Sequence, residues 1–244
     1  MTKNKFAYSL LLLSFILITS FCSSENKSTY QTGKWITLFD GESFDGWKAY
    51  GVDTISTKWE IEDGMIIVSR EGNAIDKNTG FGRSIMTVDE YDNFELELEY
   101  RMSPGGNSGL IYHVKEDSTY YMDYETGPEF QLLDDENSPS ESIEKRFTAS
   151  LYDMMAPNEN KVLNPAGEWN SVKLIYNNGH VEHWLNGAKV LEYTEGGERW
   201  NSAFEHSKWP NFPGWAKYQT GHIALQDHGD FVAFKNIRVR KILN

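Results

Sequence analysis

The 244-residue chain contains a single cysteine, Cys22, which excludes an intramolecular disulfide and a cysteine-based zinc site. It is also poor in positive charge, because 23 Lys and Arg stand against 36 Asp and Glu, a formal net charge of −13. Binding to nucleic acid is therefore not expected, since phosphate contacts need a basic surface. Beyond residue 21 no apolar run approaches the roughly 20 residues that span a bilayer, so we expect no transmembrane helix.

Several catalytic motifs are missing as well. The sequence has no G-x-S-x-G nucleophile elbow, no P-loop and no H-E-x-x-H zinc motif. It also lacks the E-x-D-x-x-E strand in which two carboxylates flank the bond that a laminarinase-type glycosidase cleaves. Gln131, two residues after Glu129, puts an amide where that motif has an acid. Hydrolysis by a pair of carboxylates is therefore disfavoured.

The N-terminal segment has the pattern of an export signal. Lys3 and Lys5 precede an almost wholly apolar run over residues 7–21, which is too short for a spanning helix and predicts a signal peptide over residues 1–21. Cys22 ends this run and precedes polar residues, an arrangement that resembles a bacterial lipoprotein processing site. We therefore predict lipidation of Cys22, a tether over residues 22–33, and a periplasmic or outer-membrane-anchored lipoprotein. Ordinary secretion is the alternative.

The rest of the chain alternates apolar and polar residues with the period of a β-strand, most clearly over residues 93–102. Asn178-Gly179 and Asn186-Gly187 are strong signals for hairpin turns. No long helical stripe and no fixed-period repeat is found. We therefore predict one all-β domain over residues 34–244, a two-sheet antiparallel β-sandwich, with a barrel as the alternative.

The segment Gly127–Asp135, with the sequence G-P-E-F-Q-L-L-D-D, carries the first candidate site. On a regular strand, Glu129 and Gln131 share one face, while Phe130 points into the core. A carboxylate and an amide on one face can bind sugar hydroxyls, and Glu can act as a base or an acid. An ordinary solvent-exposed strand face is the alternative. Asp134 would lie on the core face unless a bulge turns it.

The segment Gly221–Gly229, with the sequence G-H-I-A-L-Q-D-H-G, carries the second. His222, Gln226 and His228 alternate with apolar residues and are predicted to share one face. Two histidines and a glutamine on one face can serve as acid and base groups, as substrate ligands or as metal ligands. Histidines with a structural role near a turn are the alternative.

Other candidates are scattered along the chain. His183 lies in the middle of a predicted strand, and His113 lies in the apolar strand that follows Asn107. Asn107 is either a turn residue or a contact to a sugar hydroxyl. Tyr152 and Asp153 place a phenol beside a carboxylate. The loop over residues 200–215 holds three tryptophans, including Trp209, which either stack on a sugar ring or form a hydrophobic cluster beneath the loop.

Several strings, in a fixed order, resemble one family, the bacterial 3-keto-disaccharide hydrolase domain, which has a concanavalin A-like lectin/glucanase sandwich (a jelly roll). The resemblance covers about Trp35–Ile242. One departure is His113, where the family more often has Arg, so an anion or carbonyl contact at that position is not implied. The strings that carry the resemblance are W-I-T-L-F-D-G-E-S-F-D-G-W (Trp35–Trp47), N-S-G-L-I-Y (Asn107–Tyr112), G-P-E-F-Q-L-L-D-D, L-Y-D (Leu151–Asp153), P-A-G-E-W-N (Pro165–Asn170), E-H-W-L-N-G and G-H-I-A-L-Q-D-H-G.

The resemblance implies an enzyme that acts on sugars already oxidised at C3 by a separate sugar 3-dehydrogenase. A ketone at C3 makes the C2 proton acidic, so a base can remove it and the C1 substituent then leaves by β-elimination. Water adds to the resulting double bond, which completes cleavage of a 3-keto-glycoside such as 3-keto-trehalose. The protein must supply a base, donors for the enolate oxygen and an acid for the leaving group.

Our assignment of roles follows from that chemistry. We predict Glu129 or His183 as the base and His228 as the acid or the enolate donor. A divalent metal of the Ca or Mn type that polarises the ketone is an alternative. A non-catalytic carbohydrate-binding lipoprotein and a conventional glycoside hydrolase are the rival functions. The predicted substrate contacts are Asn107, His113, Gln131, Asp134, Tyr152, Asp153, Trp209 and Gln226.

Overall fold

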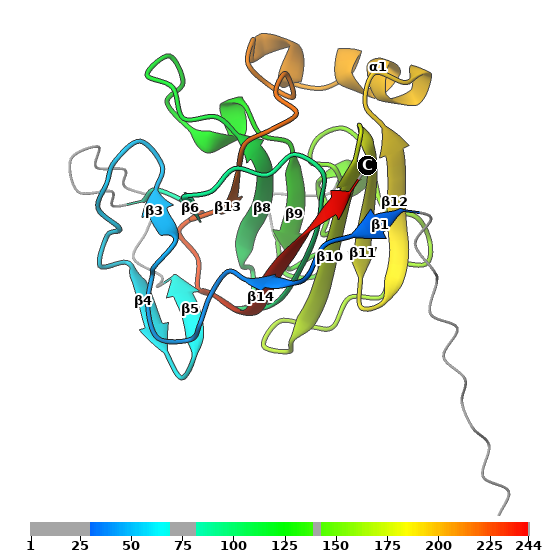
Figure 1. Ribbon diagram of the computed structural model, residues 1–244. Coiled ribbons are helices and arrows are strands. Elements are labelled where there is room, and N and C mark those ends of the chain that lie inside the picture. The colour runs from blue at the N-terminus through cyan, green and yellow to red at the C-terminus, as the bar shows by residue number, and fades with distance from the viewer. Residues whose placement is uncertain (1–29, 69–81, 139–142, 244) are drawn as a thin grey trace, which may run out of the picture.

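The computed structural model describes residues 30–68, 82–138 and 143–243, which form two antiparallel sheets packed around one core (Figure 1). The predicted all-β sandwich is therefore confirmed. The predicted signal peptide, Cys22 and most of the tether lie outside these residues. No helix within the described ranges is long and apolar enough to cross a membrane.

The larger sheet has nine strands, with β1 (Gln31–Thr32) and β2 (Ile36–Thr37) added to β14. On its central strand β7 (Phe94–Met102) the inward side chains are apolar and the outward ones are charged, as the alternation predicts. Asn178 and Asn186 have positive φ angles of 50° and 48°, which confirms the two hairpin turns. The main path runs through β12 (Ala188–Thr194), β11 (His180–Leu185), β10 (Asn170–Asn177), β7 (Phe94–Met102), β14 (Val232–Leu243), β5 (Met65–Val68) and β4 (Trp59–Glu62).

The smaller sheet has five strands and carries most of the candidate site. Residues paired across neighbouring strands share a face, so the register sets Met86, Ala224, Ile111 and Glu129 in one row on the outer face. Their chain neighbours, such as Leu110, point into the sandwich core. The strand order is β3 (Trp47–Ala49), β6 (Ile85–Thr87), β13 (His222–Leu225), β8 (Asn107–Val114) and β9 (Glu129–Leu133).

Two long connections supply the remaining parts of the site. The connection from β8 to β9 contains η1 (Asp123–Glu125), and the connection from β12 to β13 contains α1 (Glu198–Glu205) and η3 (Trp209–Asn211). In Figure 1 these green and orange segments gather above the same end of the two sheets. A third connection, from β9 to β10, contains η2 (Glu144–Arg146).

Candidate active site

Glu129 lies on β9 with its side chain on the outer face of the small sheet, where the strand alternation places it. Its carboxyl group occupies the space above Gly109 on β8. Gly109 is the residue paired with Gln131. A Cβ atom at position 109 would lie 2.2 Å from Glu129 Oε1, a distance that real structures do not show. The glycine of the N-S-G-L string therefore makes room for the carboxyl group.

The environment of Glu129 favours the protonated form. The residue is only 4% exposed, and burial raises the pKa of its carboxyl group to about 8. The Lys208 cation opposes this rise in the pKa, the nearby Asp123 carboxyl adds to it, and a hydrogen bond from the Gln226 side chain lowers the pKa slightly. A carboxyl group with a pKa near neutrality is suited to taking and returning a proton.

Asn107, Gln226 and His228 lie beside Glu129 on the same face. The Gln226 backbone N–H donates to the Gly109 carbonyl at 2.9 Å, and Asn107 Nδ2 lies 3.4 Å from His228 Nε2. Within the described residues, the buried oxygens Asn107 Oδ1 and Gln226 Oε1 have no hydrogen-bond donor. Unpaired buried acceptors fit a ligand rich in O–H donors, such as a sugar.

A cavity of about 170 Å³ adjoins these groups. Its size suits one sugar ring rather than a long oligosaccharide, and one of its lining residues, His228, is exposed to solvent. It is lined by Gly82, Met122, Asp123, Tyr124, Gln226, Asp227 and His228.

Lys208 is a site residue that the sequence alone does not indicate. Its ammonium lies 4.6 Å from the centre of the Tyr152 ring and 5.6 Å from that of Tyr124, so aromatic faces hold the cation beside Glu129. Asp153 accepts a hydrogen bond from the Lys208 backbone N–H at 2.9 Å and pairs with Arg146 at 2.8 Å. Asp153 therefore positions Lys208, while the Tyr152 ring forms part of the site.

Asp123 and Tyr124 of η1 are also absent from the sequence prediction. No sequence motif marks them. They line the cavity because η1 packs against β8 in the folded structure. The one local signal is position: Asp123 lies four residues before the G-P-E-F-Q string.

An ion pair within the protein fixes the chain between Gln226 and His228. Asp227 forms a buried ion pair with Lys58, with 2.7 Å between Nζ and Oδ1, and also accepts from the Gly229 N–H at 2.9 Å. Burial raises the pKa of Asp227, although Lys58 opposes the rise. The pair fixes the direction in which the residues after β13 leave the sheet.

His183, predicted as the alternative base, does not share the face of Glu129. It is fully buried in the sandwich core, stacked on Phe130 with 4.4 Å between ring centres, and its Nδ1 lies 3.0 Å from the Ala149 carbonyl oxygen. Since Phe130 points to the side of β9 opposite Glu129, His183 is separated from the cavity by the sheet. Burial lowers the pKa of His183 to about 4.

His113 also lies on the core side, where simple alternation does not predict it. The pairing of β13 with β8 is shifted between His222 and Ala224, and His113 takes a φ of 54° in this bulge. Its ring packs 4.2 Å from the centre of Tyr176, and Nε2 lies 2.9 Å from the Asp92 carbonyl oxygen. Burial lowers the pKa of His113 to about 4. It does not reach the cavity.

Three further predicted contacts are taken up by the protein itself. Trp209 is fully buried and stacks on Trp215 with 4.6 Å between ring centres, so the loop tryptophans form a hydrophobic cluster rather than an exposed platform. Asp134 accepts from the Gly105 N–H and from Asn137 Nδ2, both at 2.8 Å, which closes a turn. Gln131 shares the Glu129 face, but its Oε1 accepts from the Leu132 N–H at 3.2 Å.

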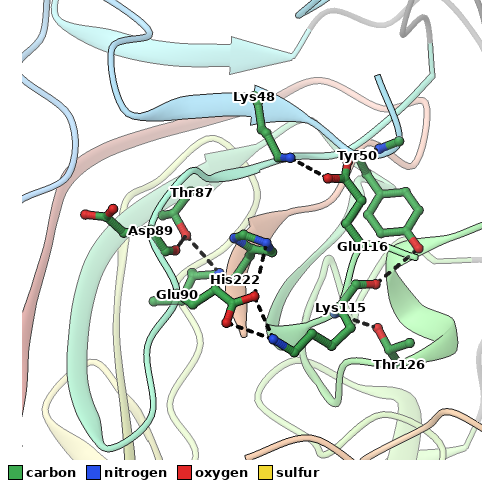
Figure 2. A network of polar contacts seen from close by, with 11 residues as sticks. Lys48, Tyr50, Thr87, Asp89, Glu90, Lys115, Glu116, Thr126 and His222 are labelled. Carbon is green, nitrogen blue, oxygen red and sulfur yellow. Dashed lines mark hydrogen bonds and ion pairs between the residues drawn. The ribbon is translucent and has the colours of Figure 1, made fainter. Parts of the chain in front are cut away.

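His222 lies on the outer face, at the opposite end of the small sheet from His228. Figure 2 shows it beside Glu90, with 3.6 Å between Nε2 and Oε1, while Lys115 Nζ approaches the same carboxylate at 2.6 Å. Buried Tyr50 packs with Met86, Ile111, Val114 and Ala224 on the outer face, and Ile111 is the residue paired with Glu129. His222 is therefore not part of the cavity.

One group of three acidic and histidine side chains has ligand atoms close enough for a metal ion within the described residues. It comprises His180, Glu182 and Glu192 on the outer face of β11 and β12, in the other sheet from Glu129. Lys189 Nζ lies 3.3 Å from Glu182 Oε1 and 2.5 Å from Glu192 Oε2, so an ammonium already neutralises the carboxylates. No cofactor is established at this group or at the cavity beside Glu129.

A larger groove of about 640 Å³ crosses the outer face of the nine-stranded sheet. Polar side chains along it already have partners within the protein: Arg238 Nε donates to Glu97 at 3.0 Å, Asn236 donates to Glu99 at 2.7 Å, and Asp40 accepts from the Glu42 N–H at 2.8 Å. Saturated polar groups give a ligand little to bind. We therefore place the chemistry in the smaller cavity, where buried polar groups lack partners.

Comparison with known proteins identifies the family and supports the fold. The chain is 39% identical over 228 residues to the 3-keto-disaccharide hydrolase of Bacteroides thetaiotaomicron, which covers 84% of this chain and 78% of that protein. A crystal structure named a "putative glycosyl hydrolase" from Parabacteroides distasonis has 38% identity and a TM-score of 0.77, covering 86% of this chain and 94% of that one. A galectin-like protein of Bacillus subtilis, at 13% identity and a TM-score of 0.55, shares the fold alone. Residues 34–240 match the family model for the 3-keto-alpha-glucoside-1,2-lyase-like domain, and the chain belongs to that family.

Proposed function

We propose that this protein is an enzyme that cleaves the glycosidic bond of 3-keto-glycosides, including 3-keto-disaccharides. One observation carries the proposal: a buried carboxyl group, Glu129, with a pKa raised to about 8, lies beside the Lys208 cation and next to Gln226, which lines a cavity where, among the described residues, Gln226 Oε1 and Asp123 Oδ2 lack hydrogen-bond partners. A carboxyl group whose pKa lies near 8 can take a proton from carbon as a carboxylate and return it afterwards.

The first step is removal of the C2 proton by the Glu129 carboxylate. The charge that develops on the C3 oxygen needs a donor or a cation, and Lys208 lies near enough to Glu129 to lower the pKa of its carboxyl group. Asn107, Gln226 and His228 then hold the hydroxyls of the oxidised ring. His183, which the sheet separates from the cavity, has no role in this scheme.

The second step is loss of the C1 substituent, which leaves a double bond between C1 and C2. Water adds at C1, and Glu129 returns its proton to C2. Glu129 thus acts as a base and then as an acid, and the sum of the two steps is hydrolysis. This route requires the ketone, so an unoxidised glycoside is not a substrate.

The test is a paired assay with 3-keto-trehalose and trehalose. We expect glucose release from the oxidised sugar only, and loss of release in Glu129→Gln. Cleavage of trehalose would support a conventional glycoside hydrolase, and binding of 3-keto-trehalose without product would support a carbohydrate-binding protein. Arms with EDTA and with added Mn²⁺ or Ca²⁺ show whether a divalent metal takes part.

The setting of the reaction is part of the proposal. We propose that a separate sugar 3-dehydrogenase supplies the oxidised substrate, and that export and lipidation of Cys22 place the domain in the periplasm or on the outer membrane. The charge pattern and apolar run before Cys22 support export. Incorporation of an alkynyl fatty acid into the wild type but not into Cys22→Ala would support the anchor, and equal labelling of both would exclude it.

A further inference from the structure

We propose that Asp123 is the general acid of the cavity, the group that protonates the leaving oxygen of the aglycone. The inference rests on the proposed cleavage of 3-keto-glycosides and assigns a second catalytic carboxyl group to it. It gives the enzyme two carboxyl groups with different tasks, even though the chain lacks the paired-carboxylate strand of conventional glycosidases.

The geometry of Asp123 is that of a group held towards a ligand. The residue is 1% exposed and lines the cavity together with Gln226 and His228. Its Oδ1 accepts the Tyr124 backbone N–H at 2.8 Å, whereas its buried Oδ2 has no hydrogen-bond partner among the residues that the structure describes. A buried carboxyl oxygen without a partner is costly unless it is protonated or meets a donor or acceptor on a ligand.

The charges around Asp123 come from several elements. Burial raises the pKa of Asp123 and outweighs the Ser84 hydroxyl and the Arg83 cation, both before β6, which lower it. Tyr50, which follows β3, and the adjacent Tyr124 also face it. From β9, Glu129 interacts with it, because the Asp123 charge raises the pKa of Glu129.

Two buried carboxyl groups that interact do not both ionise readily, so the pair retains one proton. At rest the pKa near 8 and the charge of Asp123 place that proton on Glu129, and the reactive form is the one in which it has moved to Asp123, so that Glu129 is a carboxylate and can act as the base. The same arrangement leaves an acid ready for the leaving group. Asymmetric surroundings of this kind are how paired carboxyl groups take on separate roles.

The atoms balance over both steps. In elimination, Glu129 takes the C2 hydrogen as a proton, the electron pair of that bond forms the C1–C2 double bond, and the C1–O bond breaks. The departing oxygen takes the Asp123 proton, which gives a free alcohol and an unsaturated 3-ketosugar. In hydration, the Asp123 carboxylate takes a proton from water as its oxygen bonds to C1, and Glu129 protonates C2. Both carboxyl groups return to their starting states without any oxidant or reductant.

The test compares leaving groups in Asp123→Asn. We expect a loss of about 100-fold or more in kcat/KM for 3-keto-trehalose, whose sugar alcohol needs protonation, but less than about fivefold for 4-nitrophenyl 3-keto-glucoside, whose phenolate leaves unaided. Asn can keep the acceptor for the Tyr124 N–H, so the melting temperature should not fall. Should it fall, Asp123→Ala is used instead, with added formate expected to restore activity on 3-keto-trehalose.

Two control variants frame the comparison. Asp63→Asn makes the same change at an exposed hairpin turn with a φ of 49°, which Asn tolerates, and should leave both substrates unaffected. Glu129→Gln should slow both substrates alike. Equal losses for both substrates in Asp123→Asn, or no loss for either, would overturn the role of Asp123 while leaving the proposed function standing. If the wild type cleaves no 3-keto-glycoside, both proposals fall.

Discussion

The outer faces of the two sheets differ in how their charged side chains are paired and buried. On the nine-stranded sheet, acidic residues of β7 face basic residues of β14: Glu95 pairs with Arg240 at 2.5 Å, and Glu99 pairs with Lys235 at 3.3 Å. On the five-stranded sheet, Glu129 and Asp123 are buried beneath loops and the pKa values of both are raised. One face holds neutralised pairs, and the other holds carboxyl groups that are easier to protonate than usual.

This difference distinguishes charged side chains that stabilise the fold from carboxyl groups that can take part in a reaction. Exposed cross-strand pairs contribute about 0–1 kcal/mol each and keep the face soluble. A buried carboxyl group costs stability unless it is protonated, so its presence in a cavity needs another explanation. The volume of the groove or cavity on each sheet does not indicate which one is the active site, because the larger groove lies over the paired charges.

The largest effect is expected at Glu129. Glu129→Gln keeps the shape of the side chain but removes the base, so kcat/KM for a 3-keto-glycoside should fall by about 10³-fold or more. With the 4-nitrophenyl substrate, which needs no acid, the wild-type kcat/KM should rise with pH and level off above about 8, as the Glu129 carboxyl group ionises. A profile that is flat between pH 5 and 9 would exclude Glu129 as the base.

The same substitution should stabilise the fold at high pH. The folded-state pKa of Glu129 is raised from 4.5 to about 8, so the stability that protonation provides is complete below pH 4.5 and is lost as the pH rises through 8. Glu129→Gln avoids that loss, and its free energy of unfolding should exceed that of the wild type by on the order of 5 kcal/mol at pH 9 and match it at pH 4. Urea titrations at both pH values measure this. An unchanged difference between the two pH values would contradict it.

His183→Ala tests the boundary between core and cavity. Removing a buried ring stacked on Phe130 should lower the free energy of unfolding by about 2–4 kcal/mol, whereas kcat at 20 °C should stay within about threefold of the wild type. Leu174→Ala, at the position paired with His183 on β10, is the matched core variant. If kcat falls much further in His183→Ala than in Leu174→Ala, His183 has a role in catalysis.

The smallest effect is expected on the nine-stranded sheet. Glu97→Gln makes the same chemical change as Glu129→Gln, but at an exposed pair with Arg238. Its free energy of unfolding should change by less than about 1 kcal/mol, and kcat/KM for 3-keto-trehalose should not change. A larger loss of activity would mean that the groove above this sheet takes part in the function.

Part of the site was predictable from local pattern. Alternation puts Glu129 on the outer face of its strand, and the same rule, applied to Val181 and Leu185 on either side of His183, indicates that His183 faces the core. His113 was not predictable in this way, since its position depends on a bulge in the pairing of β8 with β13. Register between distant strands is a tertiary property, and a shift of one residue reverses the face of a side chain.

The sequence by itself determined the strands, the two hairpin turns and the family, because these depend on alternation, on Asn-Gly pairs and on short strings of residues. Only the tertiary structure decided which charged groups meet. Lys208 and Asp123 come from connections that close over the small sheet, and neither carries a motif. The pKa of a carboxyl group depends on what surrounds it in space, so the reactivity of Glu129 arises only when those connections are in place.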